Sequence, residues 1–186
     1  MSEEKGLPAT WTKRHWAELS YDAGAALDRQ EAQALEKFIE DNHNDCVSRI
    51  VMLGYYDRAR HRGPKKEQNA TKFLKHLIWM IDNAPGHPDL EQVLMVPGEA
   101  GCQKASSHWR KAVRENPDDV AILANAARFF CLISFSACET LWKKVIEIEP
   151  GNEEWHRLFS HAYLMHPDLS AGGASLPADH HALDIG

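Results

Sequence analysis

One spaced pattern of residues occurs twice in the sequence, and this repeat constrains the fold more than any other feature. A small residue, a tryptophan, a second small or medium apolar residue and a proline recur in the same order 33 positions later. The two occurrences are Ala105, Trp109, Ala112 and Pro117, and then Cys138, Trp142, Val145 and Pro150. A repeat of this length is one helix-turn-helix unit, which cannot bury its own apolar face and is stabilised by stacking on its neighbours. The pattern therefore predicts stacked helix pairs that leave a curved surface for binding.

The rest of the chain shows the same helical character. Apolar residues recur at helical spacing, and Pro-containing breaks at 83–88, 116–119 and 149–152 end one helix and cap the next. There is no long Val/Ile/Thr-rich alternation and no Asn-Gly or Asp-Gly hairpin. We therefore expect an all-α protein. The expected helices span residues 10–20, 24–41, 44–62, 66–83, 89–95, 100–115, 118–132, 135–148 and 152–165.

Length and composition limit how these helices are organised. The 186 residues, 44% of them hydrophobic and 26% charged, suffice for one compact domain or one short array. We expect a flexible N-terminus over residues 1–9 and one helical domain over residues 10–166. The last segment, residues 167–186, is rich in Gly, Ala, Ser and Pro, so we expect an irregular tail.

Two further features predict a soluble cytoplasmic protein. The N-terminal residues have no apolar region of the kind that a secretion signal needs, and no stretch approaches the roughly 20 apolar residues of a membrane helix. The four cysteines form no C-x-x-C motif. We interpret Cys46, Cys102, Cys131 and Cys138 as small buried thiols in a reducing compartment, in preference to disulfides.

The spacing of small, aromatic and proline residues resembles that of the tetratricopeptide repeat (TPR) family. The unit that ends at Pro117 matches at Ala105, Trp109 and Ala112, and the next unit matches from Leu123 onward if its inter-helix turn is one residue shorter. The resemblance is specific over about 99–163 and looser over 16–83, where the unit from Ile50 carries extra residues. It implies a right-handed TPR-like α-solenoid of about four antiparallel helix pairs plus a closing helix, with a general helical-repeat fold as the alternative.

The resemblance also implies a binding surface, because inner-face residues of each first helix line the concave groove in that family. On this chain the groove positions are Tyr55, Arg58, Asn125, Arg128, His156, Ser160 and Tyr163. An Asn side chain can hydrogen-bond a peptide backbone, and an Arg can bind a carboxylate with two hydrogen bonds. We therefore expect a non-catalytic scaffold or adaptor that binds a segment of another protein. The arginines favour an acidic segment. The alternative is that Asn125 and Arg128 only form the solvated stripe of their helix.

The sequence offers little support for catalysis, a cofactor or a metal. The motifs H-E-x-x-H, G-x-x-x-x-G-K-[ST], G-x-G-x-x-G and G-x-S-x-G are absent. The histidines at 156, 161 and 166 are five residues apart, so a helix turns each about 140° from the last. His180 and His181 are expected to be surface residues of the tail. We expect no enzyme activity, no cofactor and no metal site.

The charge distribution leaves two other functions open. The chain carries a net charge of −6, but residues 58–75 hold seven basic residues and one acidic residue, so this segment is +6 and the remainder −12. Because Tyr55, Tyr56, Phe73 and Trp79 flank or lie within this segment, it is an alternative nucleic-acid site. Alternatively, this segment is only a solvated turn between two helices. A third alternative is that the chain is a subunit of a larger assembly. The sequence does not indicate the oligomeric state.

Overall fold

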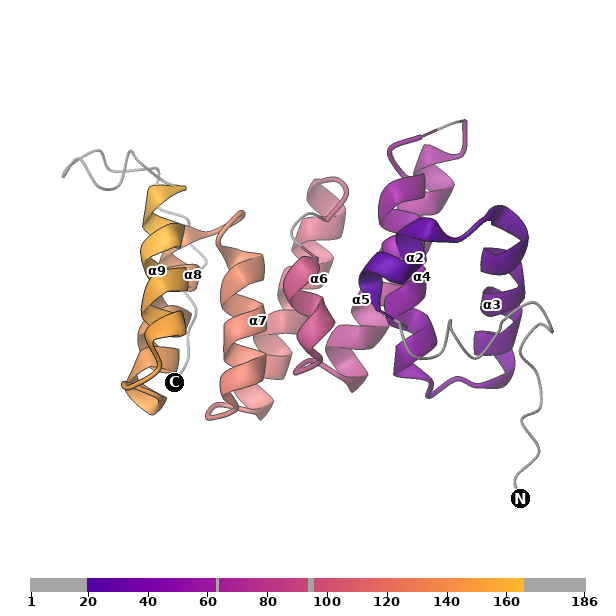
Figure 1. The fold of residues 1–186 in the computed structure, drawn as a ribbon. Coiled ribbons are helices and arrows are strands. Elements are labelled where there is room, and N and C mark those ends of the chain that lie inside the picture. The colour runs from indigo at the N-terminus through magenta and orange to yellow at the C-terminus, as the bar shows by residue number, and fades with distance from the viewer. Residues whose placement is uncertain (1–19, 63, 94–95, 166–186) are drawn as a thin grey trace, which may run out of the picture. The chain divides into compact units, whose positions relative to one another are not determined.

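Every regular element in the described part of the chain is a helix (Figure 1). The computed structural model describes residues 20–62, 64–93 and 96–165. This confirms the all-α class. The expected N-terminal segment 1–9, the tail 167–186 and the helix at 10–20, apart from Ser20, lie outside these ranges. The elements are α2 (Tyr21–Ala26), α3 (Arg29–Asp41), α4 (Cys46–Ala59), α5 (Lys66–Asn83), the 3-10 helix η1 (Pro88–Gln92), α6 (Glu99–Glu115), α7 (Val120–Phe130), α8 (Phe135–Ile148) and α9 (Glu153–Leu164).

The chain divides into two compact units, Met1–Ala84 and Pro85–Gly186, which we call unit 1 and unit 2. The described part of unit 1 holds α2 to α5, and that of unit 2 holds η1 and α6 to α9. A single domain over residues 10–166 stays a prediction. Of the described helices, none is both long enough and apolar enough to cross a bilayer. The cytoplasmic location also stays a prediction.

Helix α4 is the centre of unit 1, because α2, α3 and α5 all pack against it. Its residues from Ser48 to Gly54 are all buried, as expected for a helix with neighbours on several sides. The contact with α2 is close enough to require glycine on both helices. A Cβ placed on Gly24 would lie 1.8 Å from the carbonyl oxygen of Val51, and one on Gly54 would lie 1.8 Å from that of Tyr21. These two glycines therefore allow the α2 and α4 backbones to touch.

The single helix expected over 24–41 is wrong, because the chain breaks between α2 and α3. Leu27 is in an extended conformation, and Asp28 caps the new helix. The Asp28 carboxylate accepts from the backbone N–H groups of Gln30 and Glu31 at 2.7 and 2.9 Å, and the Glu31 side chain accepts from the Asp28 N–H at 2.8 Å. This capping box stabilises a helix start at Arg29 and so ends the preceding helix.

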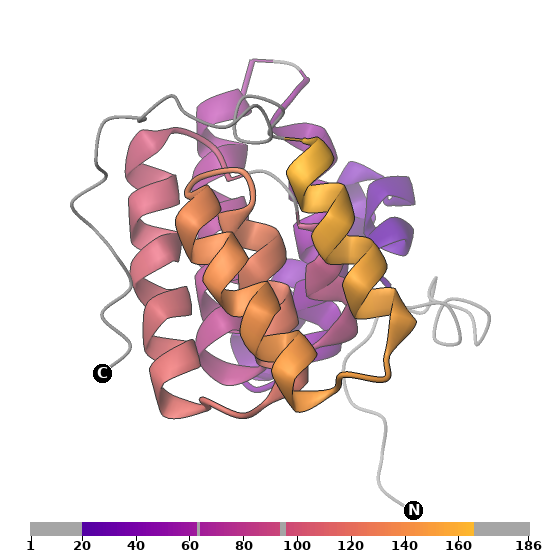
Figure 2. The same cartoon turned by 90° about the vertical axis from the view of Figure 1, so that its left-hand side faces the viewer.

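In unit 2 the α-helices pack in chain order, α6 on α7, α7 on α8 and α8 on α9, and η1 also contacts α7 (Figure 2). Trp109 and Trp142 are 2% and 1% exposed, which confirms their prediction as core residues. The ring of Trp109 lies 6.3 Å from that of Phe129, and the ring of Trp142 lies 6.1 Å from that of Trp155. The tryptophans thus pack α6 against α7 and α8 against α9.

Two expectations for unit 2 are corrected. The α-helix expected over 89–95 is the short 3-10 helix η1, which begins at Pro88 and ends before Val93. Cys131 and Cys138 form a disulfide, so the prediction of reduced thiols is wrong for this pair. The tight turn between α7 and α8 brings the two Cα atoms to 5.0 Å, within the range that a disulfide bridges. Cys46 and Cys102 are free and half-buried.

Candidate functional site

The residues predicted to line one groove are divided between the two units. Tyr55 and Arg58 belong to unit 1, whereas Asn125, Arg128 and the α9 positions belong to unit 2. The structure does not place the two units relative to one another, so a single groove formed by both sets stays a prediction.

Asn125 is hydrogen-bonded to backbone carbonyls of its own unit. Its side chain is buried, and its amide nitrogen donates to the carbonyl oxygens of Pro85 and His87, both at 3.0 Å. These bonds use both donors of the amide and fasten the segment before η1 to α7. Asn125 therefore has no free donor for a partner's backbone, and it is not a residue of the solvated stripe either.

Arg128 is also engaged within unit 2. Its guanidinium carbon lies 5.7 Å from the ring centre of Trp142 and 5.9 Å from that of Trp155, and Nη2 lies 3.4 Å from the Glu91 carboxylate. Burial lowers the pKa of Arg128, and the nearby carboxylates of Glu91 and Glu154 oppose this shift. The side chain is 19% exposed. Arg128 thus packs against α8 and α9 as a cation on aromatic rings.

The α9 positions form contacts within unit 2. The exposed Ser160 hydroxyl donates to the His156 carbonyl oxygen at 2.8 Å, and the His156 ring nitrogen lies 3.1 Å from the Pro150 carbonyl oxygen. The Tyr163 hydroxyl donates to Glu139 at 2.6 Å, and this hydrogen bond raises the pKa of Tyr163. None of these three side chains lines the cleft described below.

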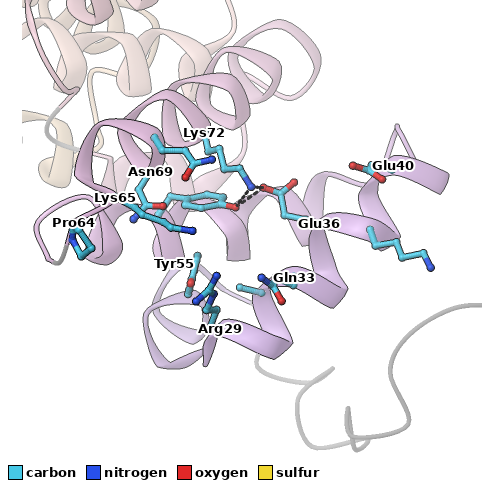
Figure 3. Close-up of a pocket in the computed structure, with 13 residues that line it drawn as sticks. Arg29, Gln33, Glu36, Glu40, Tyr55, Pro64, Lys65, Asn69 and Lys72 are labelled. Atoms are coloured by element: carbon cyan, nitrogen blue, oxygen red, sulfur yellow. Dashed lines mark hydrogen bonds and ion pairs between the residues drawn. The ribbon is translucent and has the colours of Figure 1, made fainter.

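A cleft of about 600 Å³ lies in unit 1, between α3 on one wall and the start of α5 on the other (Figure 3). Tyr55 and Tyr56, near the end of α4, lie between the walls. Of the predicted groove residues, Tyr55 alone lines this cleft. Arg58 is exposed on the same helix, but its guanidinium donates to the Ala25 carbonyl oxygen. The lining residues are Arg29, Ala32, Gln33, Glu36, Lys37, Glu40, Tyr55, Tyr56, Pro64, Lys65, Gln68, Asn69 and Lys72.

A hydrogen-bonded network forms the floor of the cleft. The buried Tyr56 hydroxyl donates to Glu36 Oε1 at 2.5 Å and accepts from Lys72 Nζ at 3.0 Å, and Lys72 Nζ also lies 3.5 Å from Glu36. The His76 ring, 1% exposed, reaches the same carboxylate oxygen at 3.3 Å and stacks on Tyr56. One carboxylate of α3 thus joins one side chain of α4 and two of α5, which fixes the two walls against each other.

The network keeps Glu36 ionised. Burial by itself would raise the pKa of Glu36, but the hydrogen bonds from His76 and Tyr56 and the charge of Lys72 lower it to about 2. Burial and the hydrogen bond to Glu36 raise the pKa of Tyr56, so the phenol stays protonated and remains a donor. At neutral pH the Glu36 carboxylate therefore compensates the charge of Lys72.

The remaining lining gives the cleft a positive charge. Arg29, Lys37 and Lys65 are exposed, and the described residues provide no ion-pair partner for them. The lining holds four basic residues and two acidic ones, Glu36 and Glu40. The side-chain amides of Gln33 and Gln68 are exposed between the charged groups. Cations and amides of this kind bind carboxylates and polypeptide backbone.

Sequence reasoning identified only part of this cleft. Lys65 and Lys72 were recognised as members of the basic segment 58–75, but not as the wall of a site. Arg29, Gln33 and Lys37 were missed, although they recur at i, i+4 and i+8 and therefore share one face of α3. By the repeat register, α4 is a first helix, and α3 and α5 are second helices. The cleft is thus built mainly from positions other than the inner-face positions that the resemblance implied.

The structure leaves few stacking platforms beside the basic segment. Tyr56 and Phe73 are buried, and the guanidinium of Arg49 lies 4.0 Å above the ring of Trp79. Arg60 lies over the Phe73 ring and pairs with Asp57. Single-stranded nucleic acids bind by stacking bases on accessible rings. Among these aromatic residues only Tyr55 and Tyr56 line the cleft, and Tyr56 is buried and stacked on His76, so the geometry favours a polypeptide ligand.

Among the described residues, 20–62, 64–93 and 96–165, no three His, Cys, Asp or Glu side chains lie close enough together to hold a metal ion. No family model, no curated protein and no solved structure matches the chain.

Proposed function

We propose that this protein is a TPR-like helical-repeat protein that acts as a non-catalytic interaction module, and that the cleft of unit 1 binds an acidic segment of a partner protein. The packing of unit 2 supports the repeat architecture, because its α-helices contact one another in chain order and its repeated tryptophans are buried between them. The binding role depends on unit 1 and does not require the units to share one surface.

The single observation that carries the binding role is the set of unpaired cations in the cleft. In a chain with a net charge of −6, Arg29, Lys37 and Lys65 line one cavity without a partner among the described residues. Like charges close together repel one another, and an anionic ligand relieves this repulsion. The fixed floor of Tyr56, Glu36 and Lys72 preorganises the site, which lowers the entropy cost of binding.

The proposal is tested by affinity purification with mass spectrometry from cells that produce the protein. The cleft variant is Lys65→Glu, because Lys65 is exposed and makes no side-chain capping bond at the start of α5. The matched control is Lys75→Glu, an equal charge change at an exposed position on α5 outside the cleft. Arg128 is unsuitable as a test position, because its substitution would disturb the packing of α8 and α9.

We expect at least one protein that co-purifies with the wild type and with Lys75→Glu but not with Lys65→Glu. Circular dichroism at 222 nm checks that both variants keep the helix content of the wild type. If every co-purifying protein is retained equally by the cleft variant and the control, the cleft is not the binding site and the proposed function is wrong.

A further inference from the structure

The two walls of the cleft are in register with each other. On α4 and α5, Tyr56 contacts Lys72 and the Ala59 carbonyl oxygen accepts from Asn69, so these two helices run in opposite directions. Helix α3 also runs opposite to α4, because a four-residue turn, 42–45, joins them. Helices α3 and α5 therefore run in the same direction, and the Glu36–Lys72 contact at 3.5 Å sets their alignment.

This alignment places like residues opposite each other. Seven positions before Glu36 and Lys72 lie Arg29 and Lys65, and three positions before them lie Gln33 and Asn69. All six residues line the cleft. Figure 3 shows Arg29 and Lys65 on opposite sides of Tyr55, at the end of the cleft away from Glu40. One end of the cleft is thus a pair of facing cations, and the middle is lined by amides.

The excess positive charge of the cleft lies at this end alone. Arg29 and Lys65 have no carboxylate among the residues that line the cleft beside them. At the other end, Lys72 is paired with Glu36, and Lys37 makes no ion pair with a described residue, but the lining there also includes Glu40, so the charges at that end sum to zero. A ligand with negative charge along its whole length would therefore meet attraction at one end and Glu40 at the other.

The geometry points to a specific ligand, an internal segment of a partner protein that is extended in the cleft and carries two adjacent acidic residues at one end. Successive side chains of an extended chain point to opposite sides. One carboxylate of an adjacent pair thus reaches Arg29 on the α3 wall, and the other reaches Lys65 on the α5 wall. This inference rests on the proposed function, whose site it shares.

The length of the cleft fixes the length of the segment. Arg29 and Glu40 are eleven positions apart on α3, which corresponds to about 16 Å along a helix axis. An extended chain covers about 3.3 Å per residue, so about five residues bridge this distance. Uncharged residues after the acidic pair would lie over Gln33 and Gln68, whose amides can bind their backbone groups.

The test uses four synthetic hexapeptides with blocked termini and a neutral fluorophore, measured by fluorescence anisotropy. Their sequences are Glu-Glu-Ser-Ser-Ser-Ser, its reverse, Glu-Ser-Glu-Ser-Ser-Ser and Glu-Ser-Ser-Ser-Ser-Glu, which share one composition and one net charge. We expect one of the two adjacent-pair peptides to bind about fivefold more tightly than the two peptides with separated acids. A fivefold difference in affinity corresponds to the strength of about one exposed ion pair.

The variants Arg29→Glu and Lys65→Glu should each abolish this preference, whereas the control Lys75→Glu should retain it. Arg29 is the first residue of α3, where an acidic residue is favourable to the helix, so the variant should fold. The affinity for the preferred adjacent-pair peptide should also fall as the salt concentration rises from 50 to 200 mM, because Arg29 and Lys65 are exposed and salt screens exposed charges.

The possible outcomes separate the two claims. Equal binding of all four peptides, lost in Lys65→Glu but kept in Lys75→Glu, would overturn the adjacent-pair inference and leave the proposed function intact. Binding that is absent, or unaffected by the cleft variants, would overturn both. A twelve-nucleotide oligo(dT) that binds the cleft more tightly than any peptide would show a site for extended polyanions and would also overturn the inference.

Discussion

Replacing Gly54 by alanine tests the packing on which unit 1 depends. The added Cβ would lie 1.8 Å from the carbonyl oxygen of Tyr21 and 2.8 Å from its carbonyl carbon. Both are backbone atoms, so no side-chain rotation relieves the clash. Ordinary contact begins at 3.4 Å, so α2 and α4 would have to move apart by roughly 1.6 Å.

Two opposing effects determine the size of the change. Alanine favours a helix interior over glycine by about 1 kcal/mol. Overpacking against fixed backbone costs about 1–3 kcal/mol, and partial exposure of Tyr21, which is 9% exposed in the intact unit, costs up to about 2 kcal/mol more. We therefore expect Gly54→Ala to lower the free energy of unfolding of unit 1 by about 2 kcal/mol, the middle of the range that these terms give.

The assay is urea denaturation followed by circular dichroism at 222 nm, with hydrogen–deuterium exchange of α4 peptides to assign the effect to unit 1. Gly151→Ala is the control, because a Cβ there has no neighbour within 4 Å. It should change stability by less than about 0.5 kcal/mol. If Gly54→Ala is as stable as the wild type, or more stable, α2 and α4 are not in backbone contact and the described packing of unit 1 is wrong.

Three further predictions concern single contacts. Asn125→Ala should destabilise unit 2 by about 1–3 kcal/mol in urea denaturation, because two partly buried carbonyl oxygens lose their donor, whereas His156→Ala should have little effect. The pKa of Glu36 is about 2 in the folded protein against an ordinary 4.5, so its stabilising contribution is complete above pH 4.5 and is lost as the pH falls toward 2. A Glu36→Gln variant should therefore show a flatter decline of stability over this range, and an unchanged decline would contradict the network. For the Cys131–Cys138 disulfide, thiol titration of the unfolded protein should find two thiols before reduction and four after it, and reduction should lower the stability of unit 2 by about 2–3 kcal/mol.

The helices could be predicted from the sequence where local signals agree. The expected boundaries 66–83 and 135–148 are those of α5 and α8, because apolar periodicity and breaking residues coincide there. The break before α3 was missed although its capping box, Asp28 and Glu31, is visible in the sequence. The apolar stripe from Leu27 to Ile39 outweighed it, since periodicity alone does not show where a helix starts.

The cleft could not be predicted because it depends on contacts between distant residues. The alignment of its walls follows from the bonds of Glu36 to Tyr56 and Lys72, which are 20 and 36 positions away. Asn125 was misjudged for the same reason, because its partners at Pro85 and His87 are about 40 residues earlier. A polar residue in an apolar helix can bind a ligand or the chain itself, and only the tertiary structure distinguishes the two.

The central claim, that unit 1 binds an acidic segment between α3 and α5, is tested most directly by NMR titration of the ¹⁵N-labelled protein with the Glu-Glu-Ser-Ser-Ser-Ser peptide and its reverse. The account predicts that amide chemical shifts change mainly for Arg29–Asp41, the end of α4 and residues 64–72. Shift changes confined to unit 2, or no saturable change at millimolar peptide, would contradict it.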